Sequence, residues 1–384
     1  MNPHVPLAWL QLTKSKVRLI GAIAGIMSTV VFCLVQMAFE DALYSSVVLL
    51  YSHLRADLVL ISPKYQCAVA TENFPERRLY QTLAIDGVES ASPLYLGMMQ
   101  WRNPQTRRPR QIFAVGFKPS EQVFDFESVN ANLPRLIQPG TIVFDEGSRP
   151  EFGNVPALFR DKGAVTSELA HRRVDVVALV RVGANFAADG TVLTSDTNFL
   201  QMLPYRSPEF VDIGLIRLRP NTDPEVARDK LAAALPKDVA VLTRNQFLDR
   251  EKQFFGDSLP VGFFFRTSVL VGLIVGAVII YQILYSDVSE HLSEYATVKA
   301  IGYPDRYLFR IVLGQALILS ALGFPPGVFV SWIVYRIARA ATLLPIGMRP
   351  TQVLAVYLMT AAMCAMAGAL AMRKLRQADP ADVF

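Results

Sequence analysis

The chain has 384 residues, of which 52% are hydrophobic and 18% are charged, and its formal net charge is +5. It is slightly more apolar than an average soluble protein and too charged for a fully embedded bundle, so we expect part of it in a membrane and part outside. The positive surplus lies beside apolar runs and gives no reason to expect nucleic acid as a partner.

Four apolar runs are long enough to cross a bilayer, because a hydrocarbon core about 30 Å thick needs about 20 helical residues. We predict spans at residues 19–39, 262–286, 311–335 and 351–372. The first run exceeds the apolar part of a usual signal peptide and no clear cleavage site follows it, so we interpret it as a retained anchor. Pro325 and Pro326 are expected to bend the third span.

Basic residues flank the first and last spans. They are Lys14, Lys16 and Arg18 before the first span, and Arg373, Lys374 and Arg376 after the fourth. Since basic residues favour the cytoplasmic side, we predict that an amphipathic segment at 1–18 and a tail at 373–384 are both cytoplasmic. The short outer loop at 336–350 disagrees in part, because it carries Arg336, Arg339 and Arg349.

Residues 40–258 separate the first two spans and are enough for a large extracytoplasmic (periplasmic) domain. Strand-like runs are predicted at 56–62, 88–96, 110–117, 140–146, 174–183, 211–220 and 238–244, and helices at 74–86 and 223–235, where Asp223 can cap and Pro224 fits the first turn. Helical stalks are expected at 40–54 and 244–259. The sequence therefore predicts an α+β domain with small mixed or antiparallel sheets.

Catalytic motifs are absent from the sequence. The chain has no Gly-Lys pair, so it lacks the phosphate-binding pattern GxxxxGK[ST]. His4, His53, His171 and His291 have no metal-ligating neighbour at a suitable spacing. Asp145 and Glu146 stand in a turn-like context in which carboxylates are common. We predict a non-catalytic chain without a metal or another cofactor.

Two pairs of small residues recur at a four-residue spacing, Gly21 with Gly25 in the first span and Gly272 with Gly276 in the second. Such pairs permit close contact between membrane helices. Because the pattern is also common by chance in apolar spans, it leaves open whether these glycines mediate dimerisation.

The connector between the second and third spans, residues 287–310, carries an apolar stripe at helical spacing. It consists of Val288, Leu292, Tyr295, Val298 and Ile301. Gly302 and Pro304 end the predicted helix. The stripe suits a helix that rests on lipid headgroups as well as one that contacts a protein, so the pattern leaves both open.

The letters EYATVKAIG, residues 294–302, resemble the signature E-[IFY]-[AG]-x-x-[KR]-A-[ILM]-G that follows the second span in FtsX-like permeases, the MacB-type class of ABC transporters. The tail DPADVF resembles the ending D-P-[AV]-E-A-[LI] of that family. The head PLAWLQLTKSKVRLIGAIAGI is similar to the DevC branch, as are ADLVLIS, GVESASPLYLG and ADGTVLTSDTNFL. The resemblance covers essentially the whole chain and its four-span layout.

The resemblance implies that the connector is a coupling helix that contacts a separate ABC ATPase subunit, which binds ATP and Mg²⁺. The implied contact residues are Glu294, Tyr295, Ala296, Lys299, Ala300 and Gly302, with tail contacts at Asp379, Pro380 and Ala381. Asp382 departs from the family, which usually has Glu there. A homodimer in membrane lipid is also implied, with a membrane fusion adaptor of the HlyD type and an outer-membrane channel of the TolC type.

This resemblance predicts the permease subunit of a tripartite exporter that transmits ATPase-driven motion to the periplasm and exports a glycolipid or another amphiphile. Two alternatives share the connector: an FtsX-like signalling or scaffold protein that regulates a periplasmic partner, and a lipoprotein-releasing permease. A secondary carrier is disfavoured, since the spans have no charged residue at mid-depth.

Overall fold

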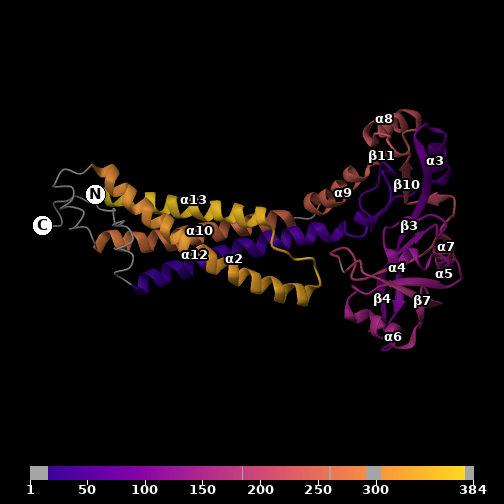
Figure 1. Ribbon diagram of the computed structural model, residues 1–384, viewed down its shortest axis with the longest axis horizontal. Coiled ribbons are helices and arrows are strands. Elements are labelled where there is room, and N and C mark those ends of the chain that lie inside the picture. The colour runs from indigo at the N-terminus through magenta and orange to yellow at the C-terminus, as the bar shows by residue number, and fades with distance from the viewer. Residues whose placement is uncertain (1–15, 184, 259–260, 291–303, 377–384) are drawn as a thin grey trace. The chain divides into compact units, whose positions relative to one another are not determined.

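The computed structural model describes residues 16–183, 185–258, 261–290 and 304–376, which Figure 1 draws as ribbon. The chain divides into two compact units, which are described separately. The helical unit comprises Met1–Ala42, Pro260–Thr342 and Ile346–Phe384, and the sheet unit comprises Leu43–Leu259 and Leu343–Pro345. The predicted fold class is confirmed: four membrane helices, with a large α+β domain inserted between the first and the second.

The membrane helices are α2 (Lys16–Val47), α10 (Val261–Glu290), α12 (Asp305–Thr342) and α13 (Pro350–Arg376). Each is long and apolar enough to cross a bilayer. All four extend beyond the predicted spans, because an apolar run marks only the part of a helix that lies in hydrocarbon. Helix α12 continues to Thr342, within the expected outer loop at 336–350, and Pro325 and Pro326 lie inside this helix.

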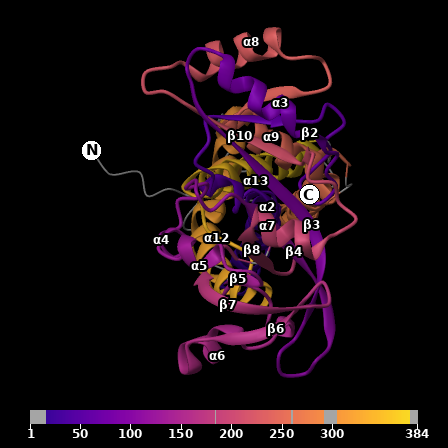
Figure 2. The ribbon, with the colours of Figure 1, turned by 90° about the vertical axis from the view of Figure 1, so that its right-hand side faces the viewer.

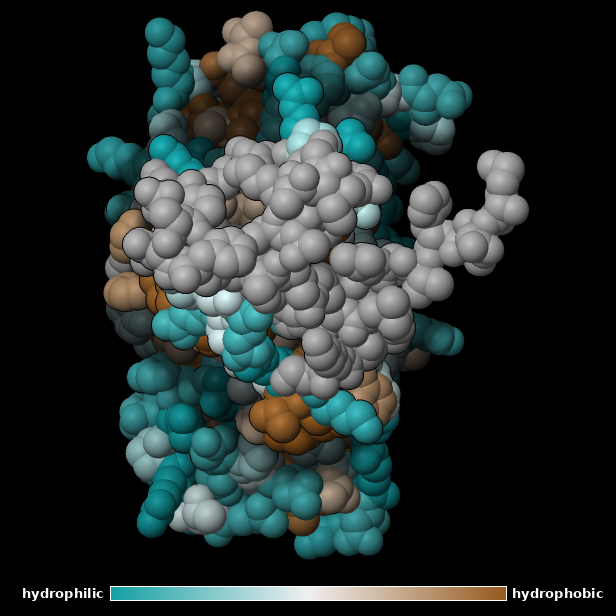
Figure 3. Space-filling view, turned by 90° about the vertical axis from the view of Figure 1, so that its left-hand side faces the viewer, coloured by the Kyte–Doolittle hydropathy of each residue, from teal (hydrophilic) through white to brown (hydrophobic). Residues whose placement is uncertain are grey.

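The spans expose apolar side chains, as helices that face lipid do. Phe263 and Phe264 near the start of α10 are 68% and 64% exposed, and Ile274 in its middle is 55% exposed. Figure 3 shows apolar side chains in brown beside hydrophilic ones in teal on one face of the molecule. A soluble protein rarely exposes this much contiguous apolar surface, so the exposure agrees with a membrane location.

The sheet unit contains eleven strands in its described part. They are β1 (Leu58–Ile61), β2 (Phe74–Pro75), β3 (Val88–Arg102), β4 (Pro109–Phe117), β5 (Thr141–Asp145), β6 (Val165–Leu169), β7 (Arg172–Val180), β8 (Thr191–Ser195), β9 (Phe210–Val211), β10 (Ile213–Leu218) and β11 (Ala240–Thr243). Its helices are η1 (Tyr51–His53), α3 (Glu76–Gln81), η2 (Thr82–Ala84), α4 (Glu127–Asn130), α5 (Leu133–Leu136), η3 (Pro150–Phe152), α6 (Val155–Lys162), α7 (Asp196–Met202), α8 (Pro224–Ala234), α9 (Arg244–Gln253) and the π-helical turn η4 (Phe254–Ser258).

Nine of these strands form one mixed sheet in the order β11-β1-β10-β3-β4-β8-β5-β7-β6, and β2 pairs only with β9. This large sheet differs from the small sheets expected from sequence, because pairing between strands distant in the chain joins the local hairpins. At one end, β11, β1, β10 and β3 are antiparallel neighbours, with α3 between β1 and β3 and α8 between β10 and β11. This is the split βαβ arrangement of ferredoxin-like folds.

Strand β3 belongs to both halves of the sheet. Its first half, Val88 to Leu94, pairs with β10, and its second half, Leu94 to Arg102, pairs with β4. Trp101 and Arg102 also pair with β6, the last strand in the sheet order. That additional pairing closes β3, β4, β8, β5, β7 and β6 into a six-stranded ring, and the length of β3 is visible in Figure 2.

Both faces of the sheet are apolar, and each has a core of its own. Along β1, Leu58 and Leu60 belong to one buried cluster, whereas Val59 and Ile61 belong to the other. This alternation follows from the two-residue period of a strand. The first cluster also contains Trp101, Phe144 and Phe199, and the second contains Phe117, Phe124 and Phe247.

Local capping agrees with the sequence. The carboxylate of Asp223 accepts hydrogen bonds from the backbone N–H groups of Glu225 at 2.8 Å and Val226 at 3.4 Å, which confirms the predicted start of α8. Thr243 and Gln246 form a capping box at the start of α9.

Candidate functional site

The predicted ATPase contacts lie outside the described residues. This applies to Glu294, Tyr295, Ala296, Lys299, Ala300 and Gly302 of the connector, and to Asp379, Pro380 and Ala381 of the tail. The structure describes the two ends of the connector, residues 287–290 at the end of α10 and residues 304–310 at the start of α12.

Those helix ends are held together by polar and apolar contacts. The Gln315 side-chain amide on α12 donates to the Asp287 carboxylate on α10 at 3.2 Å, and both side chains are buried. Arg18 at the start of α2 forms an ion pair with Glu290 at the end of α10. Val288, Val312 and Met372 pack as a small apolar cluster from α10, α12 and α13. These contacts therefore join the end of α10 to α2, α12 and α13.

The predicted small-residue pairs lie largely at helix contacts within one chain. A Cβ at Gly25 on α2 would lie 2.9 Å from Cγ2 of Ile279 on α10, and a Cβ at Gly272 would lie 2.6 Å from the ring of Phe32 on α2. At Gly276 the neighbours are Thr29 and Met363, whereas no atom comes within 4 Å at Gly21. Three of the four glycines thus permit close intrachain packing.

A third glycine pair, Gly323 and Gly327 on α12, was not singled out from sequence although it has the same spacing. A Cβ at Gly323 would lie 2.7 Å from Ile26, and one at Gly327 would lie 2.8 Å from Val30. Both neighbours are buried residues of α2. The four-residue spacing of these glycines could have predicted the contact. Pro325 and Pro326, which lie between them, drew attention to a bend instead.

In the sheet unit, two segments lead toward the spans: the last turn of α2 from Leu43 to Val47, and α9 with the π-helical turn, Arg244–Gln253 and Phe254–Ser258. Contacts in the unit tie these segments to the sheet and to one another. We call this group the stalk junction. It consists of Ser46, Tyr51, Tyr65, Phe186, Phe247, Glu251 and Phe255.

Glu251 is the polar centre of the stalk junction. It is 1% exposed, and its carboxylate accepts hydrogen bonds from the Tyr65 hydroxyl at 2.8 Å and from the backbone N–H of Ala68 at 3.2 Å. Arg250 donates to the Tyr65 carbonyl at 2.6 Å. These bonds fasten α9 to the loop between β1 and β2.

Aromatic rings surround this carboxylate. Phe247 on α9 meets Tyr51 of η1 edge-on, with 5.7 Å between ring centroids, and lies 6.0 Å from the ring of Tyr65. Since η1 follows α2 closely, these rings join the segment after α2 to α9. Arg244 adds a hydrogen bond to the carbonyl of Ser52.

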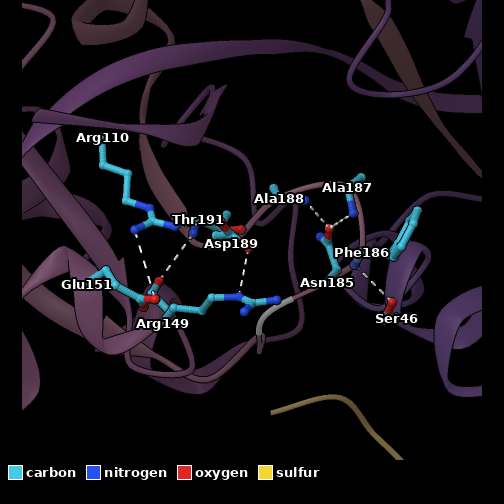
Figure 4. A network of polar contacts seen from close by, with 11 residues as sticks. Ser46, Arg110, Arg149, Glu151, Asn185, Phe186, Ala187, Ala188, Asp189 and Thr191 are labelled. Atoms are coloured by element: carbon cyan, nitrogen blue, oxygen red, sulfur yellow. Dashed lines mark hydrogen bonds and ion pairs between the residues drawn. The ribbon is translucent and has the colours of Figure 1, made fainter. Parts of the chain in front are cut away.

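A second connection runs through the loop between β7 and β8, shown in Figure 4. The backbone N–H of Phe186 donates to the Ser46 hydroxyl of α2 at 3.2 Å, and its ring meets Phe255 edge-on at 6.3 Å. The Asn185 side-chain oxygen accepts from the N–H groups of Ala187 at 2.8 Å and Ala188 at 2.6 Å, which shapes the turn. One loop thus contacts both segments that lead toward the spans.

Charged groups hold this loop at both ends. The buried Asp145 carboxylate accepts from the N–H groups of Val182 at 2.9 Å, Gly183 at 3.0 Å and Gly147 at 2.9 Å. At the other end, Asp189 forms ion pairs with Arg149 at 2.7 Å and Arg110 at 3.3 Å (Figure 4). The position of Phe186 is therefore set by the framework of the sheet.

Burial shifts the acidic groups of this region toward their neutral forms. It raises the pKa of Glu251 to about 7, although the hydrogen bonds from Tyr65 and Ala68 act in the opposite direction. It likewise raises the pKa of Asp145 to about 6, against its backbone hydrogen bonds. Such shifts mark candidate functional groups. Here Glu251 holds α9, and Asp145 holds the loop between β7 and β8 that contacts both segments.

The two buried carboxylates have their hydrogen-bond donors within the sheet unit. Donors already occupy both carboxylates: Glu251 accepts from Tyr65 and Ala68 of the loop after β1, and Asp145 accepts from the loop after β7 and from Gly147. Among the described residues, no group of three His, Cys, Asp or Glu side chains is placed to bind a metal ion. The stalk junction therefore holds the last turn of α2 and α9 to the sheet within this unit.

Comparison with known proteins gives a family match for the C-terminal part of the chain. Residues 266–380 match the family model of the FtsX-like permease C-terminal domain. That range holds most of α10, the whole connector, α12 and α13. No curated protein matches the chain.

Three solved structures are similar to the chain at low TM-scores. The periplasmic region of MacB from Actinobacillus actinomycetemcomitans has a TM-score of 0.37 and 11% identity, over 53% of this chain and 94% of that one. The extracellular domain of the noncanonic ABC-type transporter YknZ from Gram-positive bacteria has a TM-score of 0.33 and 11% identity, over 49% of this chain and 98% of that one. A domain of a putative permease protein from Porphyromonas gingivalis has a TM-score of 0.29 and 15% identity, over 50% of this chain and 88% of that one.

Proposed function

We propose that this chain is the non-catalytic permease subunit of an ABC exporter in a bacterial inner membrane. The observation that carries the proposal is the match of residues 266–380 to FtsX-like permeases, because this range contains the connector together with the spans on both of its sides. The four membrane helices and the inserted α+β domain support the same assignment.

In this proposal a separate ATPase subunit binds ATP and Mg²⁺ and engages the connector, residues 287–310, on the cytoplasmic side. The contact residues are Glu294, Tyr295, Ala296, Lys299, Ala300 and Gly302, with Asp379, Pro380 and Ala381 of the tail. A helix suits this role because its hydrogen-bonded backbone transmits a displacement that a loose turn would absorb.

The stalk junction supports transmission beyond the membrane. Motion of α2 would reach the sheet through Ser46 and η1, and motion of α10 would reach it through α9 and Glu251. Because the two routes share contacts at Phe186 and Phe247, the sheet unit would respond to the combined movement of both segments.

The four spans return the tail to the side of the head, and basic residues at both ends support the orientation with both termini in the cytoplasm. Arg349 pairs with Asp41 at 2.8 Å, and Arg266 pairs with Glu40 at 3.6 Å. Two basic residues that would favour a cytoplasmic location are thereby matched by acids at the end of the first span.

The complete exporter in this proposal is a homodimer of the chain with two ATPase subunits, a periplasmic adaptor of the HlyD type and an outer-membrane channel of the TolC type. Its cargo is a glycolipid or another amphiphile, as in the DevC-like branch. The helical unit would contact membrane lipid and transmit motion without a substrate tunnel.

Affinity purification of the tagged full chain from its native cells tests the proposal. We expect an ABC ATPase to copurify, ATP hydrolysis to require that subunit, and the double variant Glu294→Arg/Gly302→Leu to lose it. The control Glu127→Arg/Gly347→Leu makes the same changes at an exposed glutamate and at a glycine with open space around it. ATPase binding by the connector variant, or hydrolysis by the chain alone, would contradict the proposal.

The captured partners also separate the alternatives. An adaptor with a hairpin and a lipoyl domain supports tripartite export. Capture of a cell-wall hydrolase or of a lipoprotein chaperone in its place would overturn the export role and favour signalling or lipoprotein release, while leaving the ATPase contact intact.

A further inference from the structure

A polar cavity of about 350 Å³ lies in the sheet unit where β3, β10 and the loop after β4 meet. Its volume is in the range of sites for small ligands. The lining residues that carry the argument are Arg55, Glu89, Ser90, Ser92, Glu121 and Arg217. None of them belongs to the connector or to the stalk junction.

The cavity exists because β3 changes character along one face. Leu94 and Leu96 fill the apolar core on that face, whereas Ser90 and Ser92, at the preceding alternate positions, are small and hydroxylated. Leucine-sized side chains at these two positions would extend the core. The sequence of β3 therefore leaves a space and lines it with hydroxyl groups.

Ser92 supplies an unused hydrogen-bonding group. Its side chain is 4% exposed, and among the described residues its hydroxyl has no hydrogen-bond partner. A buried hydroxyl without a partner costs free energy, and a ligand in the cavity would remove this cost.

The two arginines keep capacity to bind an acidic group. Arg217 reaches only the carbonyl oxygens of Arg55, at 3.5 Å, and Gln122, at 3.4 Å, and Arg55 donates to the Gln122 side chain at 2.6 Å. In the described structure neither guanidinium is in an ion pair with a carboxylate. Arginine binds carboxylate and phosphate groups through paired N–H donors.

The lining holds two arginines, Arg55 and Arg217, and two glutamates, Glu89 and Glu121, of which Glu121 also forms a partly exposed ion pair with Lys118 at 3.8 Å. The glutamates would repel a simple anion, and the arginines would repel a simple cation. A molecule that carries both an acidic group and an ammonium group satisfies the two pairs at once. The serine hydroxyls can then complete its hydrogen bonds.

We propose that this cavity binds a small zwitterion, with its carboxylate or phosphate beside the arginines and its ammonium beside the glutamates. Two sources supply that chemistry: a free amino acid or short peptide, and the phosphoethanolamine headgroup of a lipid. The proposal does not depend on the connector or on an ATPase partner, and it assigns the sheet unit a ligand of its own.

Thermal unfolding of the full chain in detergent, followed by intrinsic fluorescence, tests this site. The probes are glycylglycine and O-phosphoethanolamine, compared with acetate, inorganic phosphate and ethylamine at equal ionic strength. We expect one zwitterion to raise Tm by about 3 °C at roughly ten times its Kd, and the single-charge probes to leave Tm unchanged. The zwitterion that acts identifies the source.

Variants localise the effect. Arg217→Met removes a group that binds the acid, and Ser90→Leu fills the cavity. Each variant should abolish the Tm increase. Arg219→Met, an exposed arginine of the same segment outside the lining, should retain it. No increase with either zwitterion, an equal increase with acetate, phosphate or ethylamine, or an increase that survives both cavity variants would overturn the proposal.

Discussion

Tyr65 donates a hydrogen bond to Glu251 over 2.8 Å in the interior of the sheet unit, although 186 positions separate the two residues in the chain. The bond fixes α9, the last regular helix before α10, to a loop that follows β1. It therefore joins the chain segment after the first span to the segment before the second.

Removal of this hydroxyl should weaken the sheet unit. In Tyr65→Phe the buried Glu251 carboxyl loses a donor, and we expect the free energy of unfolding to fall by about 1–3 kcal/mol. Tyr80→Phe is the matched control, because Tyr80 donates to Glu76 at an exposed site and should change stability by less than about 0.5 kcal/mol. Equal effects of the two variants in thermal unfolding would show that the buried bond has no special role.

The same carboxyl makes stability depend on pH. Burial raises the pKa of Glu251 from 4.5 to about 7, so between these pH values the folded state holds a proton that the unfolded state has lost. The free energy of unfolding should therefore fall as pH rises through this window, by about 3 kcal/mol in total. The contribution is fully present below the unfolded pKa and is lost above the folded pKa.

Glu251→Gln isolates that effect, because glutamine does not titrate. Asp145, whose pKa burial raises to about 6, adds a slope of the same sign at lower pH in both proteins. The difference between wild type and Glu251→Gln across pH 5–8 is thus the quantity to measure. Parallel stability curves over this range would rule out a raised pKa at Glu251.

Asp145 should hold the loop that carries Phe186. In Asp145→Ala three backbone N–H groups lose their acceptor, and we expect a loss of about 1–3 kcal/mol and faster limited proteolysis within residues 181–191. Asp189→Ala removes only partly exposed ion pairs at the other end of the loop and should cost at most about 1 kcal/mol. A loop equally resistant to protease in both variants would argue against this role for Asp145.

The contact between α12 and α2 should tolerate no added methyl group at Gly323. A Cβ there would lie 2.7 Å from Ile26, so Gly323→Ala should destabilise the helical unit by about 1–3 kcal/mol through overpacking. Ile26→Ala in the same chain should recover part of this loss, whereas Gly21→Ala, with no atom within 4 Å, should cause none. Additive effects of Gly323→Ala and Ile26→Ala would mean that the two residues do not meet.

Much of the fold follows from local pattern. Long apolar runs predicted four spans, and alternation along β4, β5, β7 and β10 predicted those strands, because both signals repeat within a few residues. The cap of α8 at Asp223 was predictable for the same reason. Strands β6 and β8 and helices α6 and α7 were missed, since each has at most eight residues and so shows too few repeats of its period.

The rest depends on contacts between distant segments. The pairing of Trp101 with Leu169 closes the ring of strands, and no short window of sequence contains both residues. Glu251 lies among charged residues in the sequence, so the neighbouring residues do not predict that it is buried and bonded to Tyr65. The cavity beside Ser92 is equally hidden, because it needs β3, β10 and a loop to be brought together.

The central claim is that the connector faces an ATPase in the cytoplasm while the sheet unit lies on the other side of the membrane. Thiol labelling in spheroplasts with a membrane-impermeant maleimide tests it directly, and the native Cys33, Cys67 and Cys364 are buried and should react slowly. Asp229→Cys, on the exposed surface of α8, should be labelled in intact spheroplasts, and Lys299→Cys only after the membrane is permeabilised. Labelling of Lys299→Cys in intact spheroplasts at the rate of Asp229→Cys would contradict the account.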